Sequence, residues 1–193
     1  MKLNSVLNKR SLGILIHPSS LPGGVYCGTF GKSAKNWIEK LSQHKIDFWQ
    51  FLPLTPTDST GSPYSSPSSF ALNPWFLDLN ELIENRFIFT SDMKELKSIN
   101  QNKDYFEFNS ADNLSKKLGE QLLKDWEFQS TERKNDFYTW IEKNNWVEDF
   151  SIFMTIKEEF NMLPWWEWPL EFKQKKIELL KSWIENKNKE IIK

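Results

Sequence analysis

Two largely apolar runs near the start of the chain constrain its fold more than any other feature. One covers residues 12–16 (LGILI) and stops at His17-Pro18, and the other covers residues 46–54 (IDFWQFLPL). Short runs in which apolar and polar residues do not alternate are typical of strands buried on both faces of a parallel sheet. We therefore expect two buried, parallel strands.

The segment between the two runs carries the spacing of one helix. Its apolar residues fall at i, i+3, i+4 and i+7, namely Ala34, Trp37, Ile38 and Leu41. Ser33 stands where a helix N-cap is expected. A strand, a helix and a strand in this order predict a crossover connection and a parallel strand pair.

Each predicted strand is followed by a long loop rich in Gly, Pro and Ser. We call residues 17–31 the first loop and residues 55–74 the second loop. Parallel strands end at the same edge of their sheet, and that edge carries the functional groups of α/β folds. Two loops of this size at one edge predict a cleft.

The chain becomes predominantly helical after Pro74. Apolar residues at helical spacing form four groups: Leu114, Leu118 and Leu122; Phe137, Trp140 and Ile141; Phe150, Phe153 and Met154; and Ile177, Leu180 and Ile184. A turn over residues 163–169 (LPWWEWP) is expected before the last helix. The overall class is therefore α/β. Two strands and about five helices cannot close a (β/α)8 barrel, which usually needs about 250 residues.

Charge and cysteine content exclude several classes of function. Lys plus Arg (25) nearly cancel Asp plus Glu (26), so no nucleic-acid or anionic membrane partner is expected. Cys27 is the single cysteine and there are two histidines, which leaves neither a disulfide nor a zinc cluster, and no metal site is predicted. No apolar run is long enough for a membrane span or an export signal. These features favour a reducing cytoplasm.

Four motifs carry a resemblance to a known family. They are GILIHPSSLPGG, FWQFLPLTPT, SPYSSPSSFALNP, and WVEDFSIFMTIKEEF followed by PWWEWP. In this order and spacing they resemble the start of the amylomaltase or disproportionating-enzyme family, the 4-α-glucanotransferases of glycoside hydrolase family 77. The resemblance covers roughly residues 10–172.

The resemblance implies a fold, a domain division and an activity. Residues 1–78 would begin a catalytic (β/α)8 barrel with its substrate-facing loops, and residues 79–193 would form an α-rich insertion subdomain and the start of its continuation. Members transfer α-1,4-glucan segments between maltodextrins without a cofactor, by a retaining mechanism that uses two carboxyl groups. The family's catalytic carboxylates would lie beyond Lys193, so this chain alone is expected to be inactive.

Substrate-binding residues carry over to two positions in the second loop. Tyr64 corresponds to the family tyrosine that stacks on the sugar at the cleavage point, and Ser62 to a serine that contacts the glucan. The chain departs from the family at Ser59, where a tyrosine serves a secondary glucan site, at Thr29, where an acidic residue is common, and at Leu72, which replaces a glycine.

Other conspicuous residues are interpreted as structural. Gly31-Lys32-Ser33 resembles the end of a P-loop, but Tyr26 stands where the earlier glycine is required. His17 lacks a nucleophile or a second ligand and is expected to form structural hydrogen bonds, and Cys27 has no neighbouring base and is expected to be inert.

The tryptophan motif near the end of the chain has two possible roles. Trp165, Trp166 and Trp168 around Glu167 either pack between helices or form a sugar platform.

Three hypotheses for the function of the chain remain open at the level of sequence. The chain is part of an active transferase, a non-catalytic maltodextrin-binding or regulatory protein, or one half of a split enzyme whose other part is separately encoded. An incomplete barrel would leave apolar strand faces uncovered, which predicts self-association.

Overall fold

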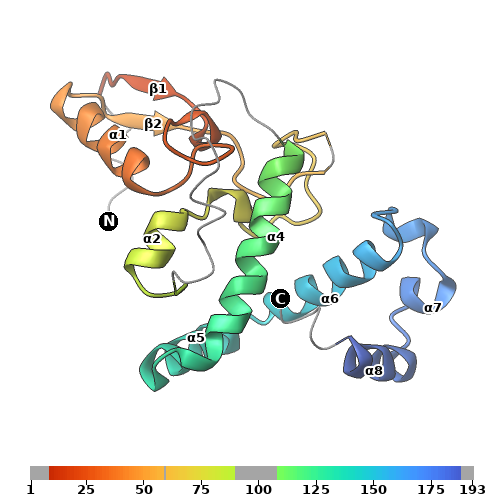
Figure 1. Ribbon diagram of the computed structural model, residues 1–193. Helices are drawn as coiled ribbons and strands as arrows, with labels where there is room; N and C mark the ends of the chain where they lie inside the picture. Colours follow the sequence, from red (N-terminus) through yellow and green to blue (C-terminus); the bar gives the residue numbers. More distant parts are fainter. Residues whose placement is uncertain (1–8, 59, 90–107, 188–193) are drawn as a thin grey trace. The chain divides into compact units, whose positions relative to one another are not determined.

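The computed structural model describes residues 9–58, 60–89 and 108–187. The chain divides into two compact units, Met1–Leu118 and Gly119–Lys193. Each unit is described by itself below, with the labels of Figure 1.

The first unit contains the predicted strand, helix and strand (Figure 1). Strand β1 (Gly13–Leu15) runs parallel to β2 (Phe48–Gln50), with Ile14 opposite Trp49, and helix α1 (Lys32–Gln43) connects them. Trp49 also donates a hydrogen bond from its indole nitrogen to the Ile16 carbonyl oxygen at 2.8 Å. The α/β class and the parallel pairing are confirmed, although each strand is shorter than its apolar run.

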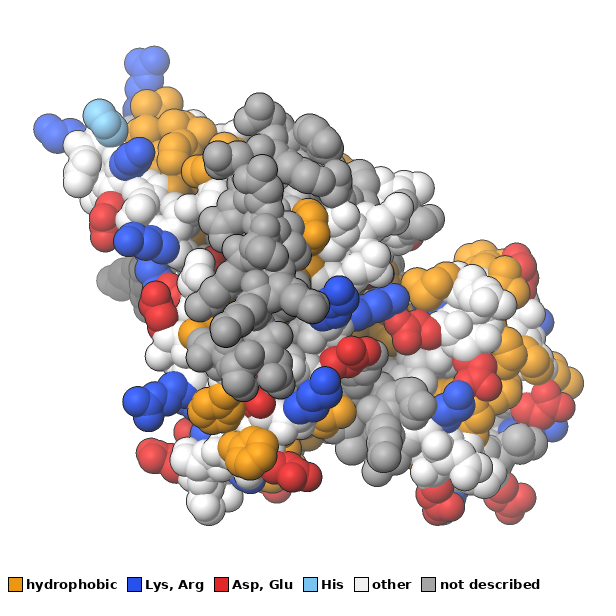
Figure 2. All heavy atoms as spheres, in the orientation of Figure 1, with side chains coloured by type: hydrophobic (Ala, Val, Ile, Leu, Met, Phe, Trp, Pro, Cys, Tyr) orange, Lys and Arg blue, Asp and Glu red, His pale blue; other side chains and the backbone are white. Residues whose placement is uncertain are grey.

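The burial of the two strands corrects the sequence-based expectation. Ile14 and Trp49 are half-buried, whereas Leu15 is 57% exposed and Phe48 is 37% exposed. One face of the sheet is therefore partly covered and the other is open to solvent. The prediction of strands buried on both faces is wrong for the described residues, because only β1 and β2 form the sheet there. Figure 2 shows hydrophobic side chains reaching the surface in the region of the strands and α1.

Helix α1 begins earlier than predicted. Its N-cap is Gly31, with no side-chain capping bond, and Ser33 lies inside the first turn. Asp78 lies close to Gly31, since a Cβ atom at position 31 would lie 2.1 Å from a carboxylate oxygen of that residue, so this approach requires glycine. Ser33 is thus not the N-cap. Of the predicted apolar stripe, Ala34 and Leu41 are buried as expected and Trp37 is half-buried, whereas Ile38 is 55% exposed.

The remaining elements of the first unit are short and follow the two loops. They are the 3-10 turns η2 (Pro18–Ser20) and η3 (Pro74–Phe76), helix α2 (Leu79–Glu84), and the first part of α4 (Phe108–Asp125). The core of the unit includes Leu21, Phe76, Leu79, Ile88 and Leu118. Loop residues therefore contribute as much to this core as the regular elements do.

The second unit consists of helices and turns, as predicted. They are the end of α4, α5 (Thr131–Lys143), α6 (Trp146–Glu159), α7 (Leu170–Lys173) and α8 (Ile177–Asn186), with the 3-10 turns η5 (Trp126–Phe128) and η6 (Trp165–Glu167). Ser130 caps α5 by accepting a hydrogen bond from the Arg133 backbone nitrogen. The helical block after Pro74 is confirmed for the described residues.

Trp168 anchors the turn that precedes α7. It is 5% exposed, packs against Phe153 and Phe160, and donates a hydrogen bond from its indole nitrogen to the Leu163 carbonyl oxygen at 3.0 Å. A buried tryptophan with a satisfied N–H is a strong packing element. The packing interpretation of the tryptophan motif is confirmed at this position.

The compact units do not share the domain boundary implied by the family resemblance. The units meet at Leu118, whereas the expected change from barrel to insertion follows residue 78. That expected boundary stays a prediction, and residues 90–107 and 188–193 of the second predicted domain lie outside the described residues. Among the helices of the described residues, none is long and apolar enough to cross a membrane.

Candidate functional site

The first and second loops border one pocket in the first unit, as the strand order predicts. The pocket has a volume of about 220 Å³. His17 and Ser19 of the first loop, Thr57, Gly61 and Pro63 of the second loop, and Phe76 of η3 are among its lining residues. None of its lining residues is Asp, Glu, Lys or Arg. The described part of the chain therefore provides a neutral pocket at the carboxyl ends of β1 and β2.

His17 contacts both its own loop and the segment that follows β2. Its Nδ1 accepts a hydrogen bond from the Ser19 backbone nitrogen at 3.4 Å and lies 2.8 Å from the Ser19 hydroxyl. Its Nε2 lies 3.5 Å from the Pro53 carbonyl oxygen, which requires the proton to be on Nε2. Burial lowers the pKa of the imidazole, and the Pro53 contact opposes that shift in part. A neutral, structural histidine is what these contacts support, as expected from the sequence.

The first loop is held in a single path by backbone contacts. Gly28 donates to the Ser19 carbonyl oxygen at 2.8 Å, and Phe30 donates to that of Phe76 at 3.0 Å. A Cβ atom on Gly28 would lie 2.1 Å from the Pro18 carbonyl oxygen, so this close approach requires glycine. These contacts hold the first loop in an ordered path, and its first residues, His17 and Ser19, line the pocket.

Cys27 is a half-buried thiol in the first loop. Its sulfur donates a hydrogen bond to the Trp75 carbonyl oxygen at 3.4 Å. Burial raises the pKa of the thiol to about 12, so the nucleophilic thiolate is essentially absent at neutral pH. The prediction that Cys27 is chemically inert agrees with this environment.

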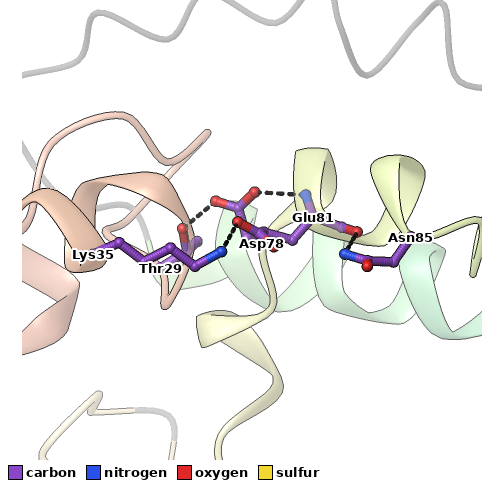
Figure 3. A network of polar contacts seen from close by, with 5 residues as sticks. All are labelled: Thr29, Lys35, Asp78, Glu81 and Asn85. Carbon is purple, nitrogen blue, oxygen red and sulfur yellow. Dashed lines mark hydrogen bonds and ion pairs between the residues drawn. The ribbon is translucent and has the colours of Figure 1, made fainter.

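A polar network ties the first loop to the start of α2 (Figure 3). The Thr29 hydroxyl donates to one oxygen of Asp78, and the other oxygen of Asp78 accepts from the Glu81 backbone nitrogen at 3.0 Å, which caps α2. Glu81 in turn pairs with Lys35 of α1, and this contact raises the pKa of the lysine. One carboxylate thus joins a loop, a helix and, through Glu81, a second helix.

The second loop presents the two residues that the family resemblance singled out. Tyr64 is 75% exposed, and its backbone nitrogen donates to the Ser62 hydroxyl oxygen at 3.3 Å. Ser62 is half-buried, and its neighbours Gly61 and Pro63 line the pocket. The structure therefore brings Ser62 and Tyr64 together beside the pocket, with the tyrosine ring open to solvent.

Sequence reasoning missed Asp58, which organises this part of the second loop. Its carboxylate accepts hydrogen bonds from Thr60 and from Ser65, on either side of Tyr64. The available signal was an aspartate followed two residues later by threonine, the pattern of a turn in which the side chain bonds the backbone. The partner at Ser65 is not deducible from that local pattern.

Trp165 and Trp166 do not form a flat platform. They are 51% and 60% exposed, and their rings meet edge to face with an interplanar angle of 83°. Two rings at right angles cannot stack together on one sugar face. The packing interpretation, confirmed at Trp168, does not describe these two exposed neighbours.

Of the three departures from the family pattern, Ser59 lies outside the described residues, and Leu72 is 72% exposed. Thr29 is explained by its bond to Asp78. No group of three or more His, Cys, Asp or Glu residues that could hold a metal is present in the described ranges.

Comparison with known proteins adds a family and close relatives. A family model described as 4-alpha-glucanotransferase matches residues 16–193. The chain is 36% identical over 183 residues to a 4-alpha-glucanotransferase of Streptococcus pneumoniae, covering 93% of this chain and 35% of that protein. It is 34% identical over 169 residues to a 4-alpha-glucanotransferase of Clostridium butyricum, covering 87% of this chain and 34% of that protein.

A solved structure shows the same fold. It is the amylomaltase from Streptococcus agalactiae in complex with acarbose, with a TM-score of 0.86 and 28% sequence identity over 95% of this chain and 37% of that one. The chain thus spans about a third of the length of the curated relatives that it matches.

Proposed function

The chain belongs to the 4-alpha-glucanotransferase family, and we propose that it forms part of the glucan-binding cleft of an enzyme that transfers α-1,4-glucan segments between maltodextrins. The observation that carries this proposal is the neutral pocket between the first and second loops, with the exposed Tyr64 beside it. Sugars are neutral ligands whose C–H faces pack on aromatic rings, so the chemistry of the pocket suits them.

Tyr64 and Ser62 have different roles in this proposal. The ring of Tyr64 stacks on a glucose residue, because a ring that is 75% exposed can bury apolar area against a sugar without leaving its own packing. Ser62 uses its hydroxyl oxygen to accept from the Tyr64 backbone nitrogen, and its hydroxyl hydrogen donates to a hydroxyl group of the sugar.

Transfer with retention of configuration requires two carboxyl groups about 5–5.5 Å apart on either side of the scissile bond. The pocket described here is lined by none. We propose that the nucleophile and the acid/base come from residues outside this pocket lining, and that the 193 residues by themselves bind glucan without cleaving it. No cofactor takes part in the reaction.

The same carboxylate-free lining favours a second candidate function, a maltodextrin-binding or regulatory protein without catalysis. A measurement of glucosyl transfer distinguishes the transferase from the binding protein. A preparation that includes the catalytic carboxylates, whether on the same chain or supplied as a separately encoded half, transfers glucosyl units under the first proposal and does not under the second.

The proposed architecture is the start of a (β/α)8 barrel. Strands β1 and β2 are its first two strands, residues 1–78 belong to the barrel, and residues 79–193 belong mainly to an α-rich insertion. The exposed side chains of Leu15 and Phe48 support further strands and helices covering this sheet in the whole enzyme. The single cysteine, which is incompatible with an intrachain disulfide, supports a reducing cytoplasm as its location.

The proposal is tested by titrating the chain with maltoheptaose in a calorimeter. Wild type is expected to bind, Tyr64→Ala to bind at least about tenfold more weakly, and an α-1,6-linked glucan of equal length not to compete. Tyr138→Ala is the matched control, because Tyr138 is 54% exposed on α5 and has no role in the pocket. Equal affinity of wild type and Tyr64→Ala would contradict the assigned role of Tyr64.

A further inference from the structure

We propose that Asp58 is a positioning residue that holds Tyr64 ready for the sugar. The proposal rests on the proposed function of Tyr64 in glucan binding. Asp58 lies six positions before Tyr64 and does not reach the pocket lining, so its effect on a ligand passes through the loop.

The carboxylate of Asp58 bonds both sides of the segment that carries Tyr64. One oxygen accepts from the Thr60 backbone nitrogen at 2.9 Å and from the Thr60 hydroxyl. The other oxygen accepts from the Ser65 hydroxyl. A single side chain therefore clamps the residues before and after the tyrosine, and hydrogen bonds to a charged acceptor are stronger than those between neutral groups.

The backbone of the same residue closes the loop. The Asp58 nitrogen donates to the Ser65 carbonyl oxygen at 2.9 Å, and the Asp58 carbonyl oxygen accepts from the Gly61 nitrogen at 3.0 Å. Gly61 has a φ of 70°, the left-handed region that glycine adopts without strain. These contacts shape a tight turn whose outer arm, from Ser62 to Ser65, presents the tyrosine.

The clamp matters because the Tyr64 ring is not fixed by packing. A ring that is 75% exposed has few contacts of its own, so its position depends on the backbone that carries it. A loop that is mobile before binding loses conformational entropy when it is ordered by the ligand, which weakens binding, whereas a loop that is already ordered loses little. Loss of the Asp58 hydrogen bonds is thus expected to weaken binding without deleting any group that touches the glucan.

The test labels the full chain with 3-fluorotyrosine and follows it by fluorine NMR. The chain has four tyrosines, so four resonances are expected, and Tyr64→Phe identifies that of Tyr64 by its loss. In Asp58→Ala, the Tyr64 resonance should move toward the position of free fluorotyrosine, while the other three stay in place. Asp58→Asn should restore the wild-type spectrum, because its amide can still accept from Thr60 and donate to Ser65.

Maltoheptaose affinity provides the second readout. Asp58→Ala should weaken binding about fivefold to tenfold, which is about 1–1.4 kcal/mol, and Asp58→Asn should stay within about twofold of wild type. In a Tyr64→Ala background, Asp58→Ala should weaken binding less than it does in wild type. Asp136→Ala, an exposed aspartate on α5, is the control and should change neither readout.

The outcomes separate this inference from the function on which it rests. An unchanged Tyr64 resonance in Asp58→Ala overturns the positioning role, and so does an equal loss of affinity with and without Tyr64. If wild type binds no maltoheptaose while the resonance still moves, the proposed function fails and the positioning of Tyr64 stands. If the circular dichroism spectrum shows that Asp58→Ala is unfolded, two milder variants decide the same question. Ser65→Ala removes the bond on one side of Tyr64. Thr60→Val removes the hydroxyl bond on the other side and keeps the bond from the backbone nitrogen.

Discussion

Thr29 donates a hydrogen bond from its hydroxyl group to the carboxylate of Asp78, 49 residues further along the chain. The same carboxylate caps helix α2 through the Glu81 backbone nitrogen. Asp78 therefore fixes the first loop against the segment that follows the second loop. An acidic residue at position 29, which the family pattern favours, would place two carboxylates side by side here, and they would repel each other. Threonine instead donates a hydrogen bond to Asp78.

Replacement of Asp78 by alanine is expected to destabilise the protein by about 1–2 kcal/mol, because it removes an N-cap and leaves the Thr29 hydroxyl without its acceptor. Urea denaturation measures the change. Asp78→Asn, which can still cap the helix, should lose less. Thr29→Asp should also lower stability near pH 7 and recover part of it at low pH, when the two carboxylates no longer repel. If the free energy of unfolding of Asp78→Ala equals that of wild type, the network contributes little to stability.

Stability should depend on pH through His17. Burial lowers the pKa of His17 below its ordinary value of 6.5, so the folded state takes up this proton less readily than the unfolded state. The contribution of His17 is fully present above pH 6.5 and is lost as pH falls through its folded pKa. Wild type should therefore lose more stability between pH 7 and pH 5 than His17→Gln does.

The only other histidine provides the control for that measurement. His44 is exposed just after α1, so His44→Gln, measured in parallel, controls for the removal of a histidine as such. Identical pH profiles for wild type and His17→Gln would contradict the proposed linkage.

The 193-residue chain alone should not convert maltotriose. Its pocket has no carboxylate in the lining, and retaining glycosyl transfer depends on two of them. Chromatography of the reaction mixture for released glucose and longer maltodextrins checks this expectation. Glucose release above that of a heat-denatured sample would show that a catalytic pair was overlooked.

The open face of the sheet should cause self-association. Leu15 on β1 is 57% exposed, and apolar side chains gathered on one surface associate in water. Analytical ultracentrifugation of wild type should show oligomers that decrease in Leu15→Lys. Leu170→Lys is the matched control, because Leu170 has the same exposed fraction in the second unit. A wild-type protein that sediments as a monomer and melts cooperatively would argue against this prediction.

Cys27 should react slowly with thiol reagents in the folded protein. Its pKa of about 12 keeps the thiolate fraction minute at pH 7, and its sulfur is bonded to the Trp75 carbonyl oxygen. Reaction with a disulfide reagent should be roughly a hundredfold slower than in the urea-unfolded chain. Rapid labelling of the native protein would indicate that the first loop opens readily.

Local patterns in the sequence determined the elements and their order. The two largely apolar runs identified β1 and β2, the spacing of Ala34 and Leu41 identified α1, and the linked motifs identified the family. Period and run length are properties of neighbouring residues, so a single sequence suffices to show them. The position of Tyr64 and Ser62 in one loop was readable for the same reason.

Only the tertiary structure decided which side chains of those elements are buried, at which residue α1 begins, and which distant side chains bond the loops. It placed Leu15 in solvent, moved the start of α1 from Ser33 to Gly31, and gave Asp58 and Asp78 their roles. Each of these depends on which distant group occupies the neighbouring space, as when Asp78 meets Gly31 and Thr29. A side-chain carboxylate has many possible donors along the chain, and the folded backbone selects among them by bringing a few within about 3 Å.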